Sequence, residues 1–477
     1  MGATTTEAPR TGGGSRSLRV RGALPAFLVA ALAFDAVVWW QGFSQEDGLF
    51  SPESASQPYR DVAWILILFV PYLWVLWAHR HGAEYRRRTI WLSFVAVAVP
   101  LVLASPIQSH DVFQYIVYGH MQVSHGLNPY VFSPAALPGD PWVAWASWAH
   151  TPSVYGPVWT ALVAGLVTLA GPHPVGSLLL VKLVTFGCVV AAGAGLAQLR
   201  NDRLHGLVAD PTGYLIAFLL NPLVLTAGVL GAHADVTLAA AFAWAMVLDQ
   251  RRRPFWALLV LGVVSLVKAY AVVALLAYAV VVWRRGQHRP LVAGGVAVVA
   301  LGVLTSWPYW QGLATLRPLL STGDHASASL AGLVQNVLGS VLGHLGVASP
   351  TTTAHLVVRA ASVVALAGLA VWVLAQPRSR REPWWVSAVL LGGFFVASPW
   401  FLPWYLLGLL VLVIPLTHPA LRRAVVAATA SMVVVLPLAH DLGQTLARYL
   451  PPLVAARWRR SSVSELVGPH VHRGLRD

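Results

Sequence analysis

The sequence feature that most constrains the fold is a succession of long apolar segments separated by short arginine clusters. Most of these segments approach the roughly 20 residues that an α-helix needs to cross a bilayer. Hydrophobic residues make up 57% of the chain and charged residues only 10%. Such a composition excludes a soluble domain of useful size. The sequence therefore predicts an all-α polytopic integral membrane protein.

The apolar segments define the expected topology. We expect about 11 to 13 transmembrane helices, including broken or re-entrant segments. The spans predicted directly are 23–43, 60–78, 89–106, 174–198, 213–230, 233–249, 291–309, 354–375, 384–400, 403–417 and 424–440. Arginine clusters at 80–88, 200–203, 251–253, 284–289, 378–381 and 422–423 are predicted to stay in the cytoplasm.

The same pattern divides the chain into a membrane domain and two tails. Residues 1–22 are predicted to be a disordered cytoplasmic tail, 23–440 a transmembrane domain and 441–477 a basic C-terminal tail. Two external loops are expected within the domain, at 107–153 and 310–353. In the second loop, Asp324 and His325 are candidates for acceptor choice, although a solvated loop explains them equally well.

The excess of basic residues does not indicate a nucleic-acid partner. The chain has 32 Lys and Arg against 18 Asp and Glu, but the arginines punctuate the spans, as the positive-inside rule requires. Cys188 is the one cysteine of the chain, so it forms no disulfide framework and is expected to pack as a small hydrophobe. The sequence also predicts no cofactor and no metal site.

Two segments do not fit simple crossings. The run 255–283 has arginine clusters at both ends, so we expect it to break near Lys268 into two short helices with the lysine near the external tip. Broken helices occur at membrane depth only where they line a cavity. Segment 155–172 is predicted to be re-entrant or interfacial, because Asp111 before it should be external and Arg200 after it internal.

A carboxylate stands at the mouth of the third predicted span. Asp111 lies within Ser109–Tyr115, just beyond the apolar run, and an ionisable group in this position suggests a functional site. Together with Gln114, Tyr115 and Tyr118 it follows helical spacing, which predicts a short helix presenting polar groups on one side. The alternative is that Asp111 merely caps this helix.

Aromatic residues follow in the same external loop. Gly126–Tyr130 predicts a turn, and the segment after it carries Trp142, Trp145 and Trp148. Such rings suit the apolar face of a sugar but equally suit a bilayer interface.

Three further motifs lie near predicted span ends. In Gly231–Asp235, His233 and Asp235 are candidates for hydrogen bonding, with an N-cap as the alternative for Asp235. Lys268 is a lone ammonium that we expect to meet a lipid phosphate, unless it simply reaches the headgroups. Lys182 is a weaker second candidate. In Ser398–Tyr405, two prolines break the backbone and aromatic residues suggest a groove rim.

These motifs, in this order, carry a resemblance. Together with Ser153–Pro157 (SVYGP) and Asn221-Pro222, they resemble the bacterial polyprenyl-phosphate-mannose-dependent α-(1→6)-mannosyltransferases, which are GT-C membrane glycosyltransferases. The resemblance spans about 109 to 405. It implies a GT-C-like fold in the bacterial plasma membrane, with the active site on the external face.

The resemblance also assigns roles. It implies that mannose passes from a polyprenyl phosphate to a lipid-linked glycan or glycolipid by an inverting mechanism, with Asp111 as the base. The candidates for the donor phosphate and sugar are Lys268, His233, Asp235, Tyr155, Trp404 and Tyr405. The acceptor-side candidates are Tyr115, Asn128 and Tyr130.

Two positions depart from the family pattern, and one other class of protein competes. Ala234 stands where the family commonly has Asn, and Leu402 where it often has His. The alternative class is a polytopic transporter or lipid flippase, which also needs broken helices and a cation within the membrane. An enzyme requires Asp111, Lys268 and Trp404-Tyr405 around a single cavity on one side.

Overall fold

The structure, a computed structural model, consists of helices joined by turns and loops in the residues that it describes. These are residues 22–43, 58–106, 109–200, 207, 210–321 and 329–431. No β-strand occurs within these ranges, which contain only isolated bridges. The predicted all-α class is confirmed for this part of the chain.

The chain separates into two compact units. The first lies within Met1–Leu320, Ala370–Gly392 and Pro403–Val434, and the second within Ser321–Leu369, Gly393–Leu402 and Val435–Asp477. The first half of the helices runs α2 (Ala23–Phe43), α3 (Pro58–Arg80), α4 (Arg87–Val102), α5 (Asp111–His125), η2 (Pro134–Ala136), η3 (Pro141–Trp145), α6 (Pro157–Ala170), α7 (Pro174–Gln198), α8 (Pro211–Leu219), η5 (Val224–Leu230) and α9 (Val236–Gln250). Then follow α10 (Pro254–Ser265), η6 (Ala269–Ala271), α11 (Val272–Arg284), α12 (His288–Ser306), η7 (Trp307–Tyr309), η8 (Ala314–Leu316), α13 (Arg317–Ser321), α14 (Leu330–His344), α15 (Pro350–Ala375), η10 (Pro377–Arg380), α16 (Pro383–Ala397), η11 (Pro403–Tyr405) and α17 (Leu406–Val413).

Several helices are long and apolar enough to cross a membrane. Among the described residues these are Ala23–Phe43, Ala63–Arg80, Pro174–Gln198, His288–Tyr309 and Pro350–Ala375. The bent pair α8 and η5 passes the same test as one broken span. The other apolar helices, including α6 over the predicted re-entrant segment, are shorter.

The predicted span 213–230 is not one continuous helix. Helix α8 ends at Leu219, and η5, which has π-helical hydrogen bonding, leaves it at an angle of 68°. Pro222 lacks the amide hydrogen that a continuous helix requires, and it disfavours helical geometry at Asn221 before it. The Asn221 side chain instead accepts from the backbone N–H of Leu223 at 2.9 Å and donates to Tyr72 Oη at 3.1 Å. Asn221-Pro222 therefore builds a bend next to Gly231–Asp235.

The predicted break near Lys268 is confirmed. Helix α10 ends at Ser265 and η6 begins at Ala269, and Lys268 between them has extended backbone geometry. Helices α10 and α11 on either side of the break contact one another. The break therefore places Lys268 in a turn between two helices.

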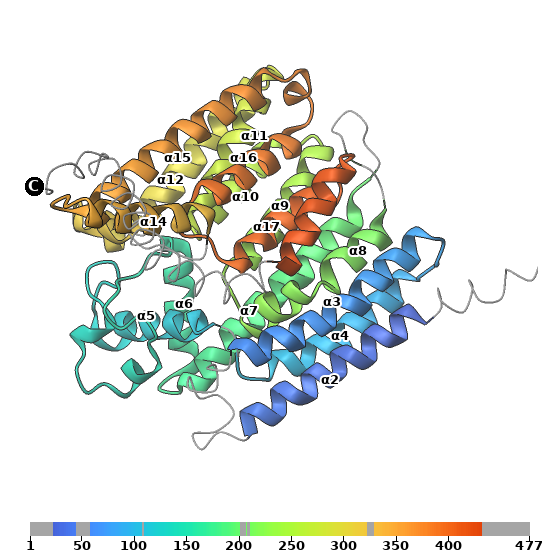
Figure 1. The fold of residues 1–477 in the computed structure, drawn as a ribbon, viewed down its shortest axis with the longest axis horizontal. Helices are drawn as coiled ribbons and strands as arrows, with labels where there is room; N and C mark the ends of the chain where they lie inside the picture. The colour runs from blue at the N-terminus through green and yellow to red at the C-terminus, as the bar shows by residue number, and fades with distance from the viewer. Residues whose placement is uncertain are drawn as a thin grey trace, which may run out of the picture. The chain divides into compact units, whose positions relative to one another are not determined.

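Within the first unit, α2, α3 and α4 run alongside one another (Figure 1). The same unit packs α7 against α9, α5 against α6 and α10 against α12. Lys182 on α7 is fully buried and donates from Nζ to the backbone carbonyls of Leu101, at 3.0 Å, and Ala104. Its ammonium satisfies carbonyl groups at the C-terminal end of α4. Lys182 thus has a structural explanation.

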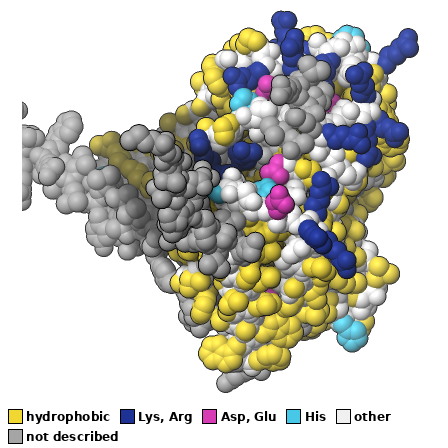
Figure 2. All heavy atoms as spheres, turned by 90° about the vertical axis from the view of Figure 1, so that its right-hand side faces the viewer, with side chains coloured by type: hydrophobic (Ala, Val, Ile, Leu, Met, Phe, Trp, Pro, Cys, Tyr) yellow, Lys and Arg dark blue, Asp and Glu magenta, His cyan; other side chains and the backbone are white. Residues whose placement is uncertain are grey.

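One face of the molecule is rich in positive charge. Figure 2 shows many arginine side chains over one part of this face and mostly hydrophobic side chains below them. Arg87, Arg200 and Arg251 line one pocket, and Arg80 and Arg423 line another. These arginines come from clusters predicted to be cytoplasmic.

Some sequence predictions lie outside the described residues. They include the two terminal tails, apart from residue 22, and the pair Asp324 and His325. The last predicted span, 424–440, is described as helical up to residue 431.

Candidate active site

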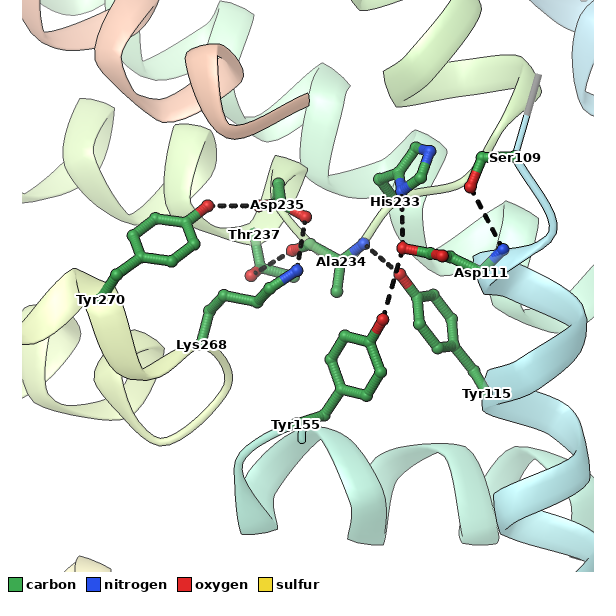
Figure 3. Close-up of polar contacts among 10 residues, drawn as sticks. All are labelled: Ser109, Asp111, Tyr115, Tyr155, His233, Ala234, Asp235, Thr237, Lys268 and Tyr270. Carbon is green, nitrogen blue, oxygen red and sulfur yellow. Dashed lines mark hydrogen bonds and ion pairs between the residues drawn. The ribbon is translucent and has the colours of Figure 1, made fainter. Parts of the chain in front are cut away.

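Four segments of the first unit bring the main candidate residues together (Figure 3). Asp111 and Tyr115 come from the start of α5, and Tyr155 comes from the segment just before α6. The turn between η5 and α9 supplies His233 and Asp235. Lys268 comes from the break after α10.

Asp111 faces this cluster. Its Oδ2 accepts a hydrogen bond from Tyr155 Oη at 3.3 Å and lies 3.4 Å from His233 Nδ1. The Asp111 side chain retains 13% of its exposure, whereas His233 retains 1%. The carboxylate is therefore held by two partners and is still partly accessible.

Asp111 is not the cap of its helix. The N-cap of α5 is His110, with no side-chain capping bond, and Asp111 is the first helical residue. The backbone N–H of Asp111 donates to Ser109 Oγ at 3.3 Å, so Ser109 satisfies this helix end. The predicted short helix is confirmed, and the capping alternative is wrong. Asp111 also benefits from the positive end of the helix dipole.

The surroundings of Asp111 favour its charged form. Burial alone would raise the pKa of this carboxyl, but contact with His233, the charges of His233 and Lys268, and the Tyr155 hydrogen bond together hold the pKa below its ordinary value. Asp111 is therefore ionised at neutral pH. A carboxylate in this state can accept a proton from a hydroxyl group.

Lys268 is paired with a carboxylate of the protein itself. Its Nζ donates to Asp235 Oδ2 at 3.0 Å, and Tyr270 Oη donates to Asp235 Oδ1. Asp235 is fully buried and stands at the N-cap position of α9, but its side chain makes no capping bond. The expectation of an ammonium whose anion is a lipid phosphate therefore needs correction. The turn 231–235 provides a first anion, which balances the buried charge.

Aromatic rings fix these charged groups in place. Lys268 Nζ lies 5.0 Å from the ring centre of Tyr155 and 5.1 Å from that of Tyr405. His233 stacks on Trp404 with ring centres 3.8 Å apart. Because a cation over an aromatic face is stabilised by the ring quadrupole, the ammonium is held between two tyrosines. Tyr155 touches both Asp111 and Lys268 and so links the two halves of the cluster.

The motif SVYGP docks on the break in the α10–α11 segment. Gly156 N–H donates to the carbonyl of Val267 at 2.9 Å, and Val158 N–H donates to that of Leu266 at 3.1 Å. The start of α6 thus satisfies carbonyls that α10 leaves unpaired at its end. A Cβ on Gly156 would lie 2.0 Å from the carbonyl oxygen of Leu266.

Replacing Gly156 should therefore disturb both the fold and the site. We expect Gly156→Ala to lower the free energy of unfolding by about 1–3 kcal/mol, because the backbone at Leu266 must move. The same movement should displace Lys268. The matched control is Gly165→Ala in α6, where nothing lies within 4 Å of the new methyl group and alanine favours the helix. Thermal unfolding of both purified variants measures the effect. Equal melting temperatures would contradict this account of the motif.

Other predicted residues hold the loop together. Asn128 donates to the carbonyl of Tyr309 at 2.8 Å, and Tyr130 Oη donates to that of Tyr155 at 2.8 Å. Gln114 accepts from Trp148 N–H at 2.9 Å, and Tyr118 Oη donates to the Thr151 carbonyl at 2.7 Å. Of the acceptor-side candidates, Tyr115 reaches the turn that carries His233 and Asp235, where its Oη accepts from Ala234 N–H at 3.4 Å, and Tyr130 contacts the cluster through the Tyr155 backbone.

A small pocket lies beside the cluster. It has a volume of about 120 Å³, and its lining includes Tyr130, Tyr155, Gly156, Ala269 and Tyr309. Tyr130 therefore lines this pocket, whereas Asn128 lies outside the lining and only holds the backbone of Tyr309, which lines it. Of the loop tryptophans, Trp142 stacks on His120 and Trp145 packs against Phe113.

Sequence reasoning missed two features of the site. One is Tyr270, whose hydroxyl donates a hydrogen bond to the second carboxylate oxygen of Asp235. Its position two residues after Lys268 was the sequence signal that could have indicated this contact. Ala232 adopts a left-handed backbone with φ of 50°, which is uncommon for alanine and is often found at functional sites. Nothing in the sequence marks this conformation.

Comparison with known proteins shows the family to which the chain belongs. The family described as "Alpha-(1->6)-mannopyranosyltransferase, N-terminal domain" matches residues 19–285, more than half of the chain. The chain belongs to this family. The matched region contains Asp111, Tyr155, His233, Asp235 and Lys268. The resemblance found in the motifs is thus confirmed.

Several curated relatives of the mannopyranosyltransferase family are similar to this chain. α-(1→6)-Mannopyranosyltransferase B of Corynebacterium glutamicum is 28% identical over 399 residues, covering 72% of this chain and 63% of the relative. A probable α-(1→6)-mannopyranosyltransferase of Mycolicibacterium smegmatis is 30% identical over 373 residues, covering 69% and 66%. α-(1→6)-Mannopyranosyltransferase A of Mycobacterium tuberculosis is 26% identical over 381 residues, covering 73% and 68%. The aligned part spans less than two thirds of the first two relatives. No solved structure matches the chain.

Proposed function

We propose that this protein is a membrane glycosyltransferase that moves mannose from a polyprenyl-phosphate donor to a glycolipid or lipid-linked glycan, forming an α-(1→6) linkage. One observation carries the proposal: a single cluster holds an ionised carboxylate, Asp111, and a fixed ammonium, Lys268, joined through Tyr155. The relatives, which are named as α-(1→6)-mannopyranosyltransferases, support mannose as the sugar and this linkage.

Asp111 is proposed to act as the general base. As the acceptor hydroxyl attacks C1 of the mannose, its proton passes to Asp111 and a new C1–O bond forms. The bond from C1 to the phosphate oxygen breaks, and polyprenyl phosphate leaves with the electron pair. One carboxylate suffices for this direct displacement. Since the displacement inverts C1, an α-linked product requires a β-linked donor.

Lys268 is proposed to stabilise the departing phosphate. An ammonium has three N–H donors, and Asp235 accepts from this one at 3.0 Å, so a phosphate oxygen can accept from another. Asp235 and the rings of Tyr155 and Tyr405 hold the ammonium before the charge develops, which is the arrangement that electrostatic catalysis needs. His233 and Trp404, which stack on one another beside Asp111, would also contact the sugar or the phosphate.

The same proposal extends to the fold and its place in the cell. We assign the chain a GT-C-like architecture with about 11 to 13 spans in the bacterial plasma membrane, with 23–440 as the membrane domain. Loop 107–153 would be external and catalytic, and loop 310–353 external as well. Arg86–Arg88 at the start of α4 support this orientation, because they favour the cytoplasm and Asp111 follows the other end of that helix. No cofactor is needed, and the lipid-linked donor would enter from the bilayer.

Donor choice tests the function. The full chain, purified and reconstituted in liposomes, is given a short α-mannoside acceptor with either polyprenyl-phosphate-mannose or GDP-mannose. We expect an extended mannoside with the lipid donor alone, and NMR should assign an α-(1→6) linkage. Transfer from GDP-mannose would overturn the lipid-donor assignment. Movement of the lipid donor across the bilayer without any transfer would favour the transporter alternative.

His233 should set the pH range of the reaction. Asp111 acts as a base only when it is deprotonated. Because its pKa is depressed, it stays deprotonated at pH values below the ordinary carboxyl pKa of about 3.9. His233→Gln removes the imidazole 3.4 Å away that helps to lower the pKa of Asp111, so the pKa of Asp111 rises. We expect kcat/KM of this variant to fall at a higher pH than in the wild type. The pH–rate profile, taken from about pH 3 to 8 so that it approaches the wild-type acidic limb, measures the shift, and superimposable acidic limbs would refute it.

A further inference from the structure

The C-terminal part of α5 and the loop after it contain a second cluster of ligand-type side chains, outside the candidate active site. His120, His125 and Asp140 each offer one ligand atom, and these atoms all lie within 4.8 Å of one another. Asp140 Oδ2 lies 3.0 Å from His120 Nε2 and 2.8 Å from His125 Nε2. The separations are a few tenths of an ångström shorter than the roughly 3.3 Å between ligands around tetrahedral zinc.

The geometry points to a zinc-type divalent metal site formed by His120, His125 and Asp140. Two imidazoles and one carboxylate are a common zinc ligand set, with water in the fourth position. The ring of His125 retains 35% of its exposure, so an ion can enter from solvent. A slight opening of the three side chains would admit the ion.

Neighbouring groups orient each part of this metal site. Ser124 Oγ lies 3.0 Å from His120 Nδ1, which allows it to fix the ring so that Nε2 faces the ion. Trp142 stacks on the same ring at 4.2 Å and donates from its backbone N–H to Asp140 Oδ1 at 2.8 Å. Such supporting contacts are typical of real metal ligands. The other carboxylate oxygen of Asp140 is thereby left to the two histidines.

The position of the cluster indicates a structural role. His120 and His125 belong to the C-terminal part of α5, and Asp140 immediately precedes η3. A metal ion would clamp the intervening loop to the helix that carries Asp111. Because a helix rises 1.5 Å per residue, His120 lies about 14 Å along α5 from Asp111. That separation excludes direct participation of the ion in proton transfer at Asp111.

Metal binding by the full chain tests this inference, independently of any transfer activity. The protein is purified through a histidine-free tag, treated with chelator, dialysed and titrated with Zn²⁺ alone, followed by metal analysis. We expect about one tightly bound zinc ion per chain. Co²⁺ in its place should give the intense visible absorption of a tetrahedral site. Thermal unfolding should occur at a higher temperature with zinc than after chelation.

Matched variants locate the ion. Asp140→Asn, His120→Gln and His125→Gln should each weaken zinc binding by more than about 100-fold, and Ser124→Ala by about 10- to 100-fold. His150→Gln changes an exposed histidine of the same loop and should leave binding unchanged. Wild-type protein without stoichiometric zinc, or without the cobalt spectrum, would overturn the site. Equal zinc affinity in all variants would do the same and would leave a metal-free network of hydrogen bonds.

Discussion

Asp111→Asn should retain the fold and lose nearly all transfer activity. The change keeps the shape of the side chain but removes its ability to take a proton from the acceptor. General base catalysis contributes about 100- to 10,000-fold, so we expect kcat to fall by that factor. The KM for the donor should change little, because the proposed phosphate contact belongs to Lys268. Initial rates with polyprenyl-phosphate-mannose measure the effect.

The control for this substitution is a carboxylate outside the site. Glu84 is exposed, and Glu84→Gln removes the same charge without touching the cluster, so its rate should equal that of the wild type. If Asp111→Asn retained a substantial part of the wild-type rate while Glu84→Gln stayed active, Asp111 could not be the base.

Lys268→Met should damage both stability and activity. It leaves the fully buried carboxylate of Asp235 without its cation, and breaking one side of a buried ion pair costs about 3–5 kcal/mol. It also removes the proposed stabilisation of the leaving phosphate, and losing one such electrostatic partner lowers kcat by about 100- to 1,000-fold. Thermal unfolding and initial rates together measure the two effects.

A double variant separates the two roles of Lys268. Lys268→Met with Asp235→Asn removes both charges, so no uncompensated charge remains buried, and most of the lost stability should return. Activity should stay low, because the donor phosphate still lacks its cation. A double variant that is both stable and active would show that Lys268 serves only to neutralise Asp235.

Local sequence patterns predicted the parts of the site that depend on local structure. The helix starting at Asp111 followed from the three- and four-residue spacing of polar groups, and the break near Lys268 followed from arginine clusters at both ends of one apolar run. Both inferences need only periodicity and the energetics of charge in a membrane. The bend at Asn221-Pro222 was missed, although proline gave a local signal for it.

Pairing between distant segments was not predictable in the same way. Lys268 and Asp235 are 33 residues apart. A lysine within an apolar run indicates only that some anion must lie near it. Tertiary packing decided that this anion is a carboxylate of the protein. The same holds for Asn128, whose amide bonds to Tyr309 across 181 positions, and for Gly156, whose need for space depends on the backbone of Leu266.

The most direct test of the central claim is a structure of Asp111→Asn with polyprenyl-phosphate-mannose bound. The claim is that Asp111 and Lys268 flank a single reaction centre. We predict a phosphate oxygen at hydrogen-bond distance, about 3 Å, from Lys268 Nζ, with the mannose between the phosphate and residue 111. A donor whose phosphate binds away from Lys268, for example at the pocket lined by Arg87 and Arg200, would contradict it.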